Sequence, residues 1–118
     1  MKHTQKGRKS EDIAVSYLQK EGYMILARNW RYGKKEVDII SQKDNYLVVT
    51  EVKSGLPGFM MRPEEAVSMR KQRMIIEVTE AFILQKSITS AVRFDIIFVT
   101  GIDPVASIEH ITDAFYPV

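Results

Sequence analysis

The feature that most constrains this chain is a pair of apolar, strand-forming segments separated by a short polar turn. The segments Glu36–Ser41 and Tyr46–Lys53 are rich in Val and Ile, and Lys43-Asp44-Asn45 between them is typical of a tight turn. The pattern therefore predicts an antiparallel hairpin. If Lys43 faces Tyr46, the numbers of facing residues always add up to the same total, and the register of the whole hairpin is defined.

The segments around the hairpin predict an α/β fold. A helix is expected over about Ser10–Glu21, with Ser10 as its N-cap and Gly22 at its end. A longer helix is expected from Pro63 to about Lys86, because proline suits the first helical position. The remaining strands are expected at Tyr23–Trp30, Arg93–Thr100 and, as a short edge strand, Ser107–Ile111. The order α-β-β-β-α-β-(β) predicts a mixed central sheet flanked by helices, in one domain of 118 residues.

Charged residues face one another within the hairpin. In the register above, Asp38 is opposite Glu51 and Glu36 is opposite Lys53, and alternation places all four side chains on one face. Directly opposed carboxylates repel each other, and the valines around Glu51 predict a strand that is buried on both faces. A hard divalent cation such as Mg²⁺ would neutralise the pair.

Lys53 adds a basic residue to this set of carboxylates. It lies two residues beyond Glu51 on the same face, where it would approach a phosphate and an attacking water. A bound ion would polarise that phosphate and lower the pKa of a bound water, so the set predicts metal-assisted phosphodiester hydrolysis. The alternative is the polar outer face of an ordinary hairpin, with Glu51 and Lys53 as solvated charges. A one-residue shift in register would remove the constellation.

Composition excludes several other kinds of site. The chain has no cysteine and two histidines, so it forms neither a disulfide framework nor a cysteine-based zinc site, and a His-rich metal site is not expected. No segment approaches the roughly 20 apolar residues that span a bilayer. The polar first twelve residues do not resemble a secretion signal. We therefore expect a cytoplasmic protein that does not enter the membrane.

Basic residues are concentrated in the first three quarters of the chain. Residues 1–86 hold 16 of the 17 Lys and Arg but 11 of the 15 Asp and Glu, a net charge of +5, and residues 87–118 have a net charge of −3. This distribution suits the phosphate backbone of a nucleic acid, and an ordinary solvated surface accounts for it equally well. The candidate contacts with nucleic acid are Arg8, Lys9, Arg28, Arg31, Lys34, Lys35, Arg70, Lys71 and Arg73.

The order of these motifs resembles a known family. Glu36-Val37-Asp38-Ile39-Ile40 followed by Glu51-Val52-Lys53 is similar to the GEIDLI…VEVK signature of the YraN family. The resemblance covers nearly the whole chain, and its other motifs include Glu11-Asp12-Ile13-Ala14, Arg28-Asn29-Trp30-Arg31, Lys71-Gln72-Arg73, Arg93-Phe94-Asp95 and Asp113-Ala114-Phe115. That family is in turn similar to archaeal Holliday-junction resolvases and other PD-(D/E)XK nucleases.

The resemblance implies a restriction-endonuclease-like core with a metal site. Asp38, Glu51 and the carbonyl of Val52 would bind Mg²⁺ or Mn²⁺. Glu11 would reach in from the first helix, and Lys53 would be the catalytic lysine. The chain departs from the family where it has Lys35 instead of the usual glycine and Gly55 instead of a basic residue. The second departure weakens the expected contact with substrate more than it weakens metal binding.

Helix residues near this site have alternative interpretations. Lys71 is a further candidate for the site because it shares a helix face with Val67, Met74 and Val78, which should lean toward the sheet. The simpler interpretation is a lysine whose ammonium extends past that face into solvent. Glu11 would equally well complement the positive end of the first helix, and Asp12 beside it is an alternative to it.

Three functions remain open from the sequence. The leading one is a metal-dependent endonuclease or resolvase-like enzyme that cleaves DNA. The second is a non-catalytic nucleic-acid-binding module on the same fold, and the third is a structural or interaction domain in which Glu51 and Lys53 form an ion pair. The intact set of Asp38, Glu51 and Lys53 favours the enzyme over the binding module. The choice between DNA and RNA and the presence of a homodimer stay open.

Overall fold

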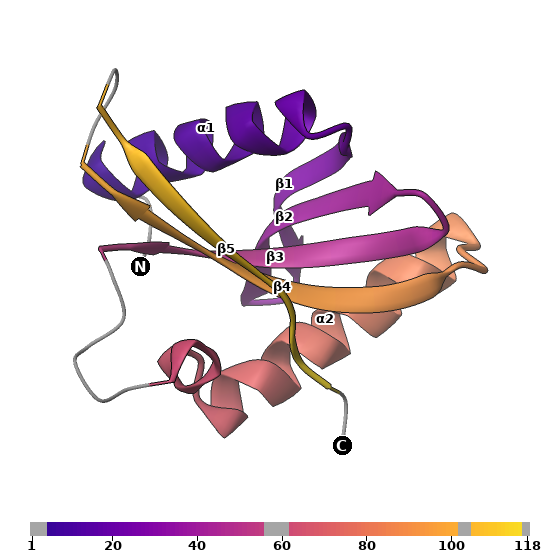
Figure 1. Ribbon diagram of the computed structural model, residues 1–118. Coiled ribbons are helices and arrows are strands. Elements are labelled where there is room, and N and C mark those ends of the chain that lie inside the picture. Colours follow the sequence, from indigo (N-terminus) through magenta and orange to yellow (C-terminus); the bar gives the residue numbers. More distant parts are fainter. Residues whose placement is uncertain (1–4, 56–61, 102–104, 117–118) are drawn as a thin grey trace.

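The protein is built on a five-stranded sheet with one long helix against each face (Figure 1). A computed structural model describes residues 5–55, 62–101 and 105–116. Its elements are α1 (Gln5–Lys20), β1 (Met24–Tyr32), β2 (Lys35–Lys43), β3 (Tyr46–Ser54), the 3₁₀ turn η1 (Pro63–Ala66), α2 (Met69–Lys86), β4 (Ala91–Thr100) and β5 (Ser107–Phe115). The predicted order of helices and strands in an α/β fold is confirmed. Within the described ranges, neither helix has the length and apolar character needed to cross a membrane.

The strands lie in the sheet in chain order, β1-β2-β3-β4-β5. β3 and β4 are parallel, and the other neighbouring strands are antiparallel. Parallel neighbours need a crossover, and α2 lies between β3 and β4 in the chain and provides it. As a result both helices begin at the end of the sheet where β3 finishes (Figure 1). We call this end, marked by Ser10, Ser54 and Lys71, the β3 end of the sheet.

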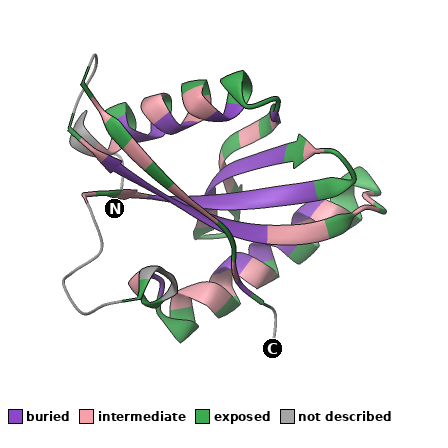
Figure 2. Cartoon of the chain, in the orientation of Figure 1, coloured by how far each residue is buried: buried purple, intermediate pink, exposed green. Residues whose placement is uncertain are grey.

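Two apolar clusters attach the helices to the sheet. Ala14 and Leu18 of α1 are completely buried against one face, and Ile75 and Val78 of α2 are buried against the other. Each large aliphatic side chain buried in this way contributes about 1.5–3 kcal/mol to folding. β3 and β4 are buried along most of their length (Figure 2). A charged side chain in the buried part of β3, such as that of Glu51, is therefore surrounded by apolar neighbours.

The start of α1 differs from the prediction. α1 begins at Gln5, so Ser10 lies inside the helix and the proposed N-cap is wrong. Gln, Lys and Arg before Ser10 are good helix formers that allow the helix to start earlier. The Ser10 hydroxyl lies 2.7 Å from that of Ser54 and connects α1 to the end of β3. Gly22, with a φ of 90°, ends the helix as predicted.

The start of α2 also differs from the prediction. Pro63 begins the separate turn η1, and α2 begins only at Met69. Ser68 is the N-cap of α2, and its side chain accepts a hydrogen bond of 3.1 Å from the amide of Lys71. A serine side chain satisfies an exposed amide at a helix start, which proline does not, so the boundary falls at Ser68.

Candidate acidic site on the β2–β3 hairpin

The predicted hairpin register is confirmed from the turn as far as Ile39 opposite Thr50. In the same register the next facing positions are those of Asp38 and Glu51. Asp38 Oδ2 accepts a hydrogen bond of 2.8 Å from the amide of Val52, so this carboxylate links β2 to β3 beside Glu51. Both acidic residues are buried, with exposed fractions of 4% and 2%.

The apolar residues on the two sides of Asp38 in β2 pack against different helices. Val37 belongs to the cluster beneath α2, whereas Ile39, two residues later, belongs to the cluster beneath α1. Strict alternation, on which the predicted common face of the charged residues depended, is therefore interrupted at Asp38. On the adjoining strand, Asn29 lies between two paired positions and has a left-handed φ of 49°.

Glu11 approaches this region from α1. Its carboxylate accepts a hydrogen bond of 2.9 Å from Asn29 Nδ2 and lies 3.5 Å from Arg28 Nη2. Glu11 is 2% exposed, whereas the side chain of its neighbour Asp12 is 65% exposed. The first turn of α1 contains no acidic residue, so the interpretation of Glu11 as a partner of the helix dipole is wrong.

Burial and the nearby charge of Asp38 both affect the ionisation of Glu11. Burial raises the pKa of Glu11 above its usual 4.5, and the negative charge of Asp38 raises it further. Hydrogen bonds from Asn29 and Arg28 act in the opposite direction without cancelling the rise. The folded protein therefore holds this proton more tightly than the unfolded chain, and Glu11 destabilises the fold as the pH rises above about 4.5. A cation bound nearby would relieve that cost.

Glu51 contacts a lysine of α2. Lys71 Nζ lies 3.3 Å from Glu51 Oε2, with exposed side-chain fractions of 36% and 2%. The predicted inclination of Lys71 toward the sheet is confirmed, and its ammonium contacts the carboxylate instead of simply extending past it into solvent. Lys53 is half-buried near the end of β3, where it is paired with Phe98 of the parallel strand β4.

The donor atoms of this acidic site suit a hard divalent cation. Asp38 and Glu51 supply carboxylate oxygens, and the hydrogen bond from Val52 fixes the orientation of Asp38, as such bonds do for metal-binding carboxylates. Within residues 5–55, 62–101 and 105–116, no three His, Asp or Glu side chains are close enough to surround an ion. Mg²⁺ needs only one or two carboxylates and completes its shell with water or substrate phosphate. The residues therefore fit an open Mg²⁺ or Mn²⁺ site and not a closed site made of protein ligands alone.

Comparison with other proteins identifies the family. The profile described as "Uncharacterised protein family UPF0102" matches residues 10–99 of the chain. The chain belongs to family UPF0102. The resemblance to the YraN family is thereby confirmed.

Relatives in UPF0102 match over almost their whole length. The UPF0102 protein of Bacteroides thetaiotaomicron is 42% identical and that of Phocaeicola vulgatus 44% identical, each over 115 residues that cover 98% of this chain and 95% of the relative. UPF0102 protein FP2501 of Flavobacterium psychrophilum is 38% identical over 114 residues, or 97% of this chain and 96% of the relative.

Basic residues of this UPF0102 protein flank the β3 end of the sheet. Arg8 and Lys9 are exposed and directly precede Ser10, which contacts Ser54. The first two turns of α2 carry three more of the predicted contacts, Arg70, Lys71 and Arg73. The β1–β2 turn lies at the same end because β2 begins there, and it carries Arg31, Lys34 and Lys35. Only Arg28 among the nine lies farther along the sheet, in the middle of β1.

Besides Lys71, which contacts Glu51, two of these cations are paired with exposed acidic side chains. Arg28 Nη2 donates a hydrogen bond to Asp12, and Lys35 Nζ donates one to Glu77, both at 2.7 Å. Exposed pairs of this kind contribute little to stability and are screened by salt. They nevertheless reduce the positive charge that Arg28 and Lys35 offer to a phosphate.

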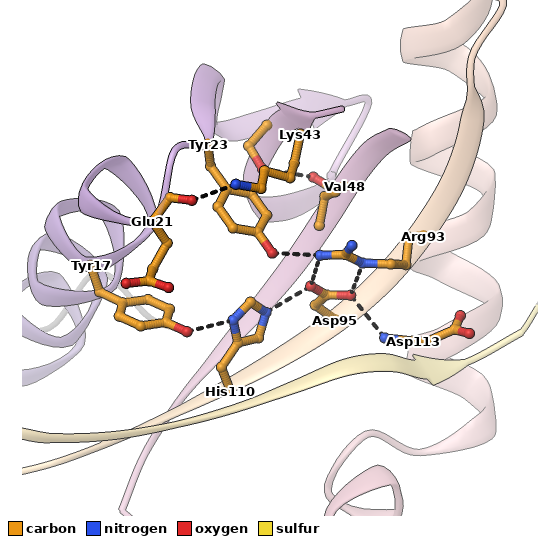
Figure 3. Close-up of polar contacts among 10 residues, drawn as sticks. Tyr17, Glu21, Tyr23, Lys43, Val48, Arg93, Asp95, His110 and Asp113 are labelled. Atoms are coloured by element: carbon orange, nitrogen blue, oxygen red, sulfur yellow. Dashed lines mark hydrogen bonds and ion pairs between the residues drawn. The ribbon is translucent and has the colours of Figure 1, made fainter. Parts of the chain in front are cut away.

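Our interpretation of the sequence missed a second buried polar group, centred on Asp95 on the α1 side of the sheet (Figure 3). Asp95 accepts hydrogen bonds of 2.9 and 2.8 Å from Arg93, 2.7 Å from His110 Nε2 and 3.0 Å from the Asp113 amide. Since a carboxylate only accepts, Nε2 of His110 carries the proton, and Nδ1 lies 2.9 Å from the Tyr17 hydroxyl. The network joins α1, β4 and β5.

Hydrogen bonding determines the charge of Asp95. Burial alone would raise the pKa of this carboxyl, but the hydrogen bonds from His110, Arg93 and the Asp113 amide outweigh burial and hold the pKa below its usual value. The sequence contained one signal for this group, because Arg93 and Asp95 are two residues apart on a strand and share a face. Their partners on α1 and β5 could not be inferred from spacing.

Proposed function

We propose that this UPF0102 protein is a metal-dependent, resolvase-like endonuclease that hydrolyses DNA phosphodiester bonds on a restriction-endonuclease-like core. The observation that carries the proposal is the hydrogen bond from the Val52 amide to Asp38, which places one buried carboxylate beside the position of another, Glu51. Buried acids in proximity cost stability unless a positive partner balances them. A bound cation would be such a partner, and a function that uses the cation would account for the arrangement.

The residues have distinct roles in the proposal. Asp38, Glu51 and the carbonyl of Val52 would hold Mg²⁺ or Mn²⁺, with Glu11 acting from α1. The ion, when bound, would lower the pKa of a coordinated water and neutralise charge on the phosphate. Lys53, two residues beyond Glu51 on β3, would stabilise the negative charge that develops on the phosphate during attack.

The surroundings of the site favour a polyanionic substrate. Exposed cations on α1, on the β1–β2 turn and on α2 surround the β3 end of the sheet, where the acidic residues also lie. A DNA backbone crossing this end would contact these cations while one phosphate reached the acidic site. Such binding is driven largely by release of counterions from DNA and weakens steeply with salt.

A cleavage panel tests the proposal. Purified protein is incubated with four-way branched, single-stranded and duplex DNA in Mg²⁺, Mn²⁺ or EDTA, and the products are separated on denaturing gels. We expect cleavage of at least one substrate with a metal, none in EDTA and none by Asp38→Asn. Glu109→Gln changes an exposed acid of β5 in the same way and should cleave like the wild type.

Measuring the binding of the same DNA substrates at several salt concentrations separates the other functions. Salt-sensitive binding of DNA without cleavage of any substrate would contradict the enzyme and indicate a non-catalytic nucleic-acid-binding module. A protein with no affinity for DNA would indicate a structural or interaction domain.

A further inference from the structure

We propose that Lys71 is an exchangeable counter-ion of the acidic site, which neutralises Glu51 in the metal-free protein and competes with a divalent cation for this carboxylate. The inference rests on the metal site of the proposed function. It goes beyond that function by assigning a task to a residue of α2 and by predicting how metal affinity is limited.

The contact joins a buried acid to an accessible base. Lys71 Nζ lies 3.3 Å from Glu51 Oε2, and 2% of the Glu51 side chain but 36% of the Lys71 side chain is exposed. A carboxylate so deeply buried requires positive charge nearby. A lysine with one third of its side chain exposed retains a short path to solvent along its flexible stem. Glu51 is therefore the fixed member of this ion pair, and Lys71 is the movable one.

The backbone of Lys71 is held independently of its ammonium. Its amide donates to the Ser68 hydroxyl at 3.1 Å, and the next residue, Gln72, donates from Nε2 to the Val67 carbonyl at 3.0 Å. One turn farther on, Ile75 is buried against the sheet. The ammonium can leave Glu51 without disturbing the start of α2, because none of these contacts involves Nζ.

Electrostatics prevent the lysine and a metal ion from sharing Glu51 unchanged. Mg²⁺ binds carboxylate oxygens at about 2.0–2.1 Å, so an ion on Glu51 Oε2 would lie within about 5.5 Å of the ammonium. Repulsion over that distance is large even at an effective dielectric constant of about 20. Metal binding must therefore displace Lys71 from Glu51, and this displacement weakens the affinity for metal. Once displaced, the ammonium would turn toward solvent, because 36% of the Lys71 side chain is exposed.

The test is calorimetric titration with Mn²⁺ in the absence of nucleic acid. Lys71→Met removes the charge and keeps an unbranched side chain, and we expect it to bind Mn²⁺ on the order of tenfold more tightly than the wild type. Lys86→Met removes an exposed charge from the far end of α2 and should change the affinity less than twofold. Lys71→Arg keeps the charge and should bind Mn²⁺ nearly as the wild type does.

A thermal measurement covers the case in which Lys71→Met is too unstable to titrate. In EDTA this variant should melt below the wild type, and Mn²⁺ should raise its melting temperature more than that of the wild type. Equal or weaker Mn²⁺ binding by Lys71→Met, an equal gain in Lys86→Met, or no binding by any variant would overturn the inference. Metal binding with the expected gain but no DNA cleavage would overturn the proposed nuclease and leave Lys71 as the counter-ion.

Discussion

Glu51 carries its charge in one of the most apolar environments of the described chain. Val48, Val49 and Val52 around it are 2% exposed or less, and Glu51 itself is 2% exposed. Lys71 balances it from α2 at 3.3 Å. A residue kept in such a place is expected to lower stability in return for a function.

Replacement of Glu51 tests this expectation. Glu51→Gln removes a buried charge, and Lys71, being partly exposed, can turn to solvent. We therefore expect the metal-free variant to be more stable than the wild type by up to about 1 kcal/mol, because like-charge repulsion in the hairpin is relieved. Mn²⁺ should no longer stabilise it. Urea unfolding in EDTA and in Mn²⁺ measures both effects, and a clear loss of stability in EDTA would show that the Glu51–Lys71 pair is structural.

The sequence was sufficient to place Asp38 near Glu51 because the two-residue turn sets the register of every pair that follows. The contact of Asn29 with Glu11 could not be predicted. It depends on a left-handed φ at Asn29 and on the packing of α1, and neither has a signal in residue spacing.

Among the elements, α1, β4 and β5 are held together by the network around Asp95 (Figure 3). Arg93 also donates a hydrogen bond of 2.6 Å to the hydroxyl of Tyr23, which directly precedes β1. Since α1 carries Glu11, this network contributes to the position from which Glu11 approaches the acidic site. Its role is structural, because Asp95 is completely enclosed.

Asp95→Asn should destabilise the fold in a manner that depends on pH. The pKa of Asp95 is lower in the folded protein than its usual 3.8, so the stability that its charge provides is complete above about pH 4 and is lost as the pH falls through the folded value. Loss of a buried pair with Arg93 should cost about 3–5 kcal/mol at pH 7. Urea unfolding at pH 7 and pH 3 should show a smaller difference between the two pH values in the variant. Glu109→Gln is the control, and equal pH dependence in Asp95→Asn and the wild type would contradict the assignment.

The type and order of the elements followed from apolar patterning, but their ends did not. α1 starts five residues before Ser10, whose hydroxyl contacts Ser54 instead of capping the helix, and β5 continues to Phe115, which stacks on Phe94 with ring centroids 5.2 Å apart. The role of Ser10 and the end of β5 both depend on contacts with distant parts of the chain. Local propensity cannot encode such contacts.

At the scale of the whole molecule, basic residues lie near both ends of the two helices. Both helices begin at the β3 end of the sheet (Figure 1). Each also ends in a lysine, Lys20 or Lys86, at the opposite end of the sheet, near the β2–β3 turn. The two helices therefore carry basic residues both near the acidic site and at the opposite end of the sheet.

This arrangement allows a charge-matched test of the DNA surface. The double substitution Arg70→Gln and Arg73→Gln should weaken DNA binding and reduce the slope of log K against log salt by up to about 2, because each lost phosphate contact removes nearly one unit. The pair Lys20→Gln and Lys86→Gln removes the same charge and should leave the slope unchanged. Fluorescence anisotropy at several salt concentrations measures both, and equal losses in the two pairs would contradict a binding surface at the β3 end.

The central claim, that the acidic site hydrolyses phosphodiester bonds with the help of Lys53, is tested most directly by the rate of cleavage of a branched DNA in Mn²⁺. Lys53→Ala should cleave on the order of 10²-fold or more slowly than the wild type, because the lysine acts on charge that develops in the transition state. Its folding and much of its DNA affinity should be retained, and Lys86→Ala at the far end of α2 should cleave at the wild-type rate. Cleavage by Lys53→Ala that is indistinguishable from that of the wild type would contradict the claim.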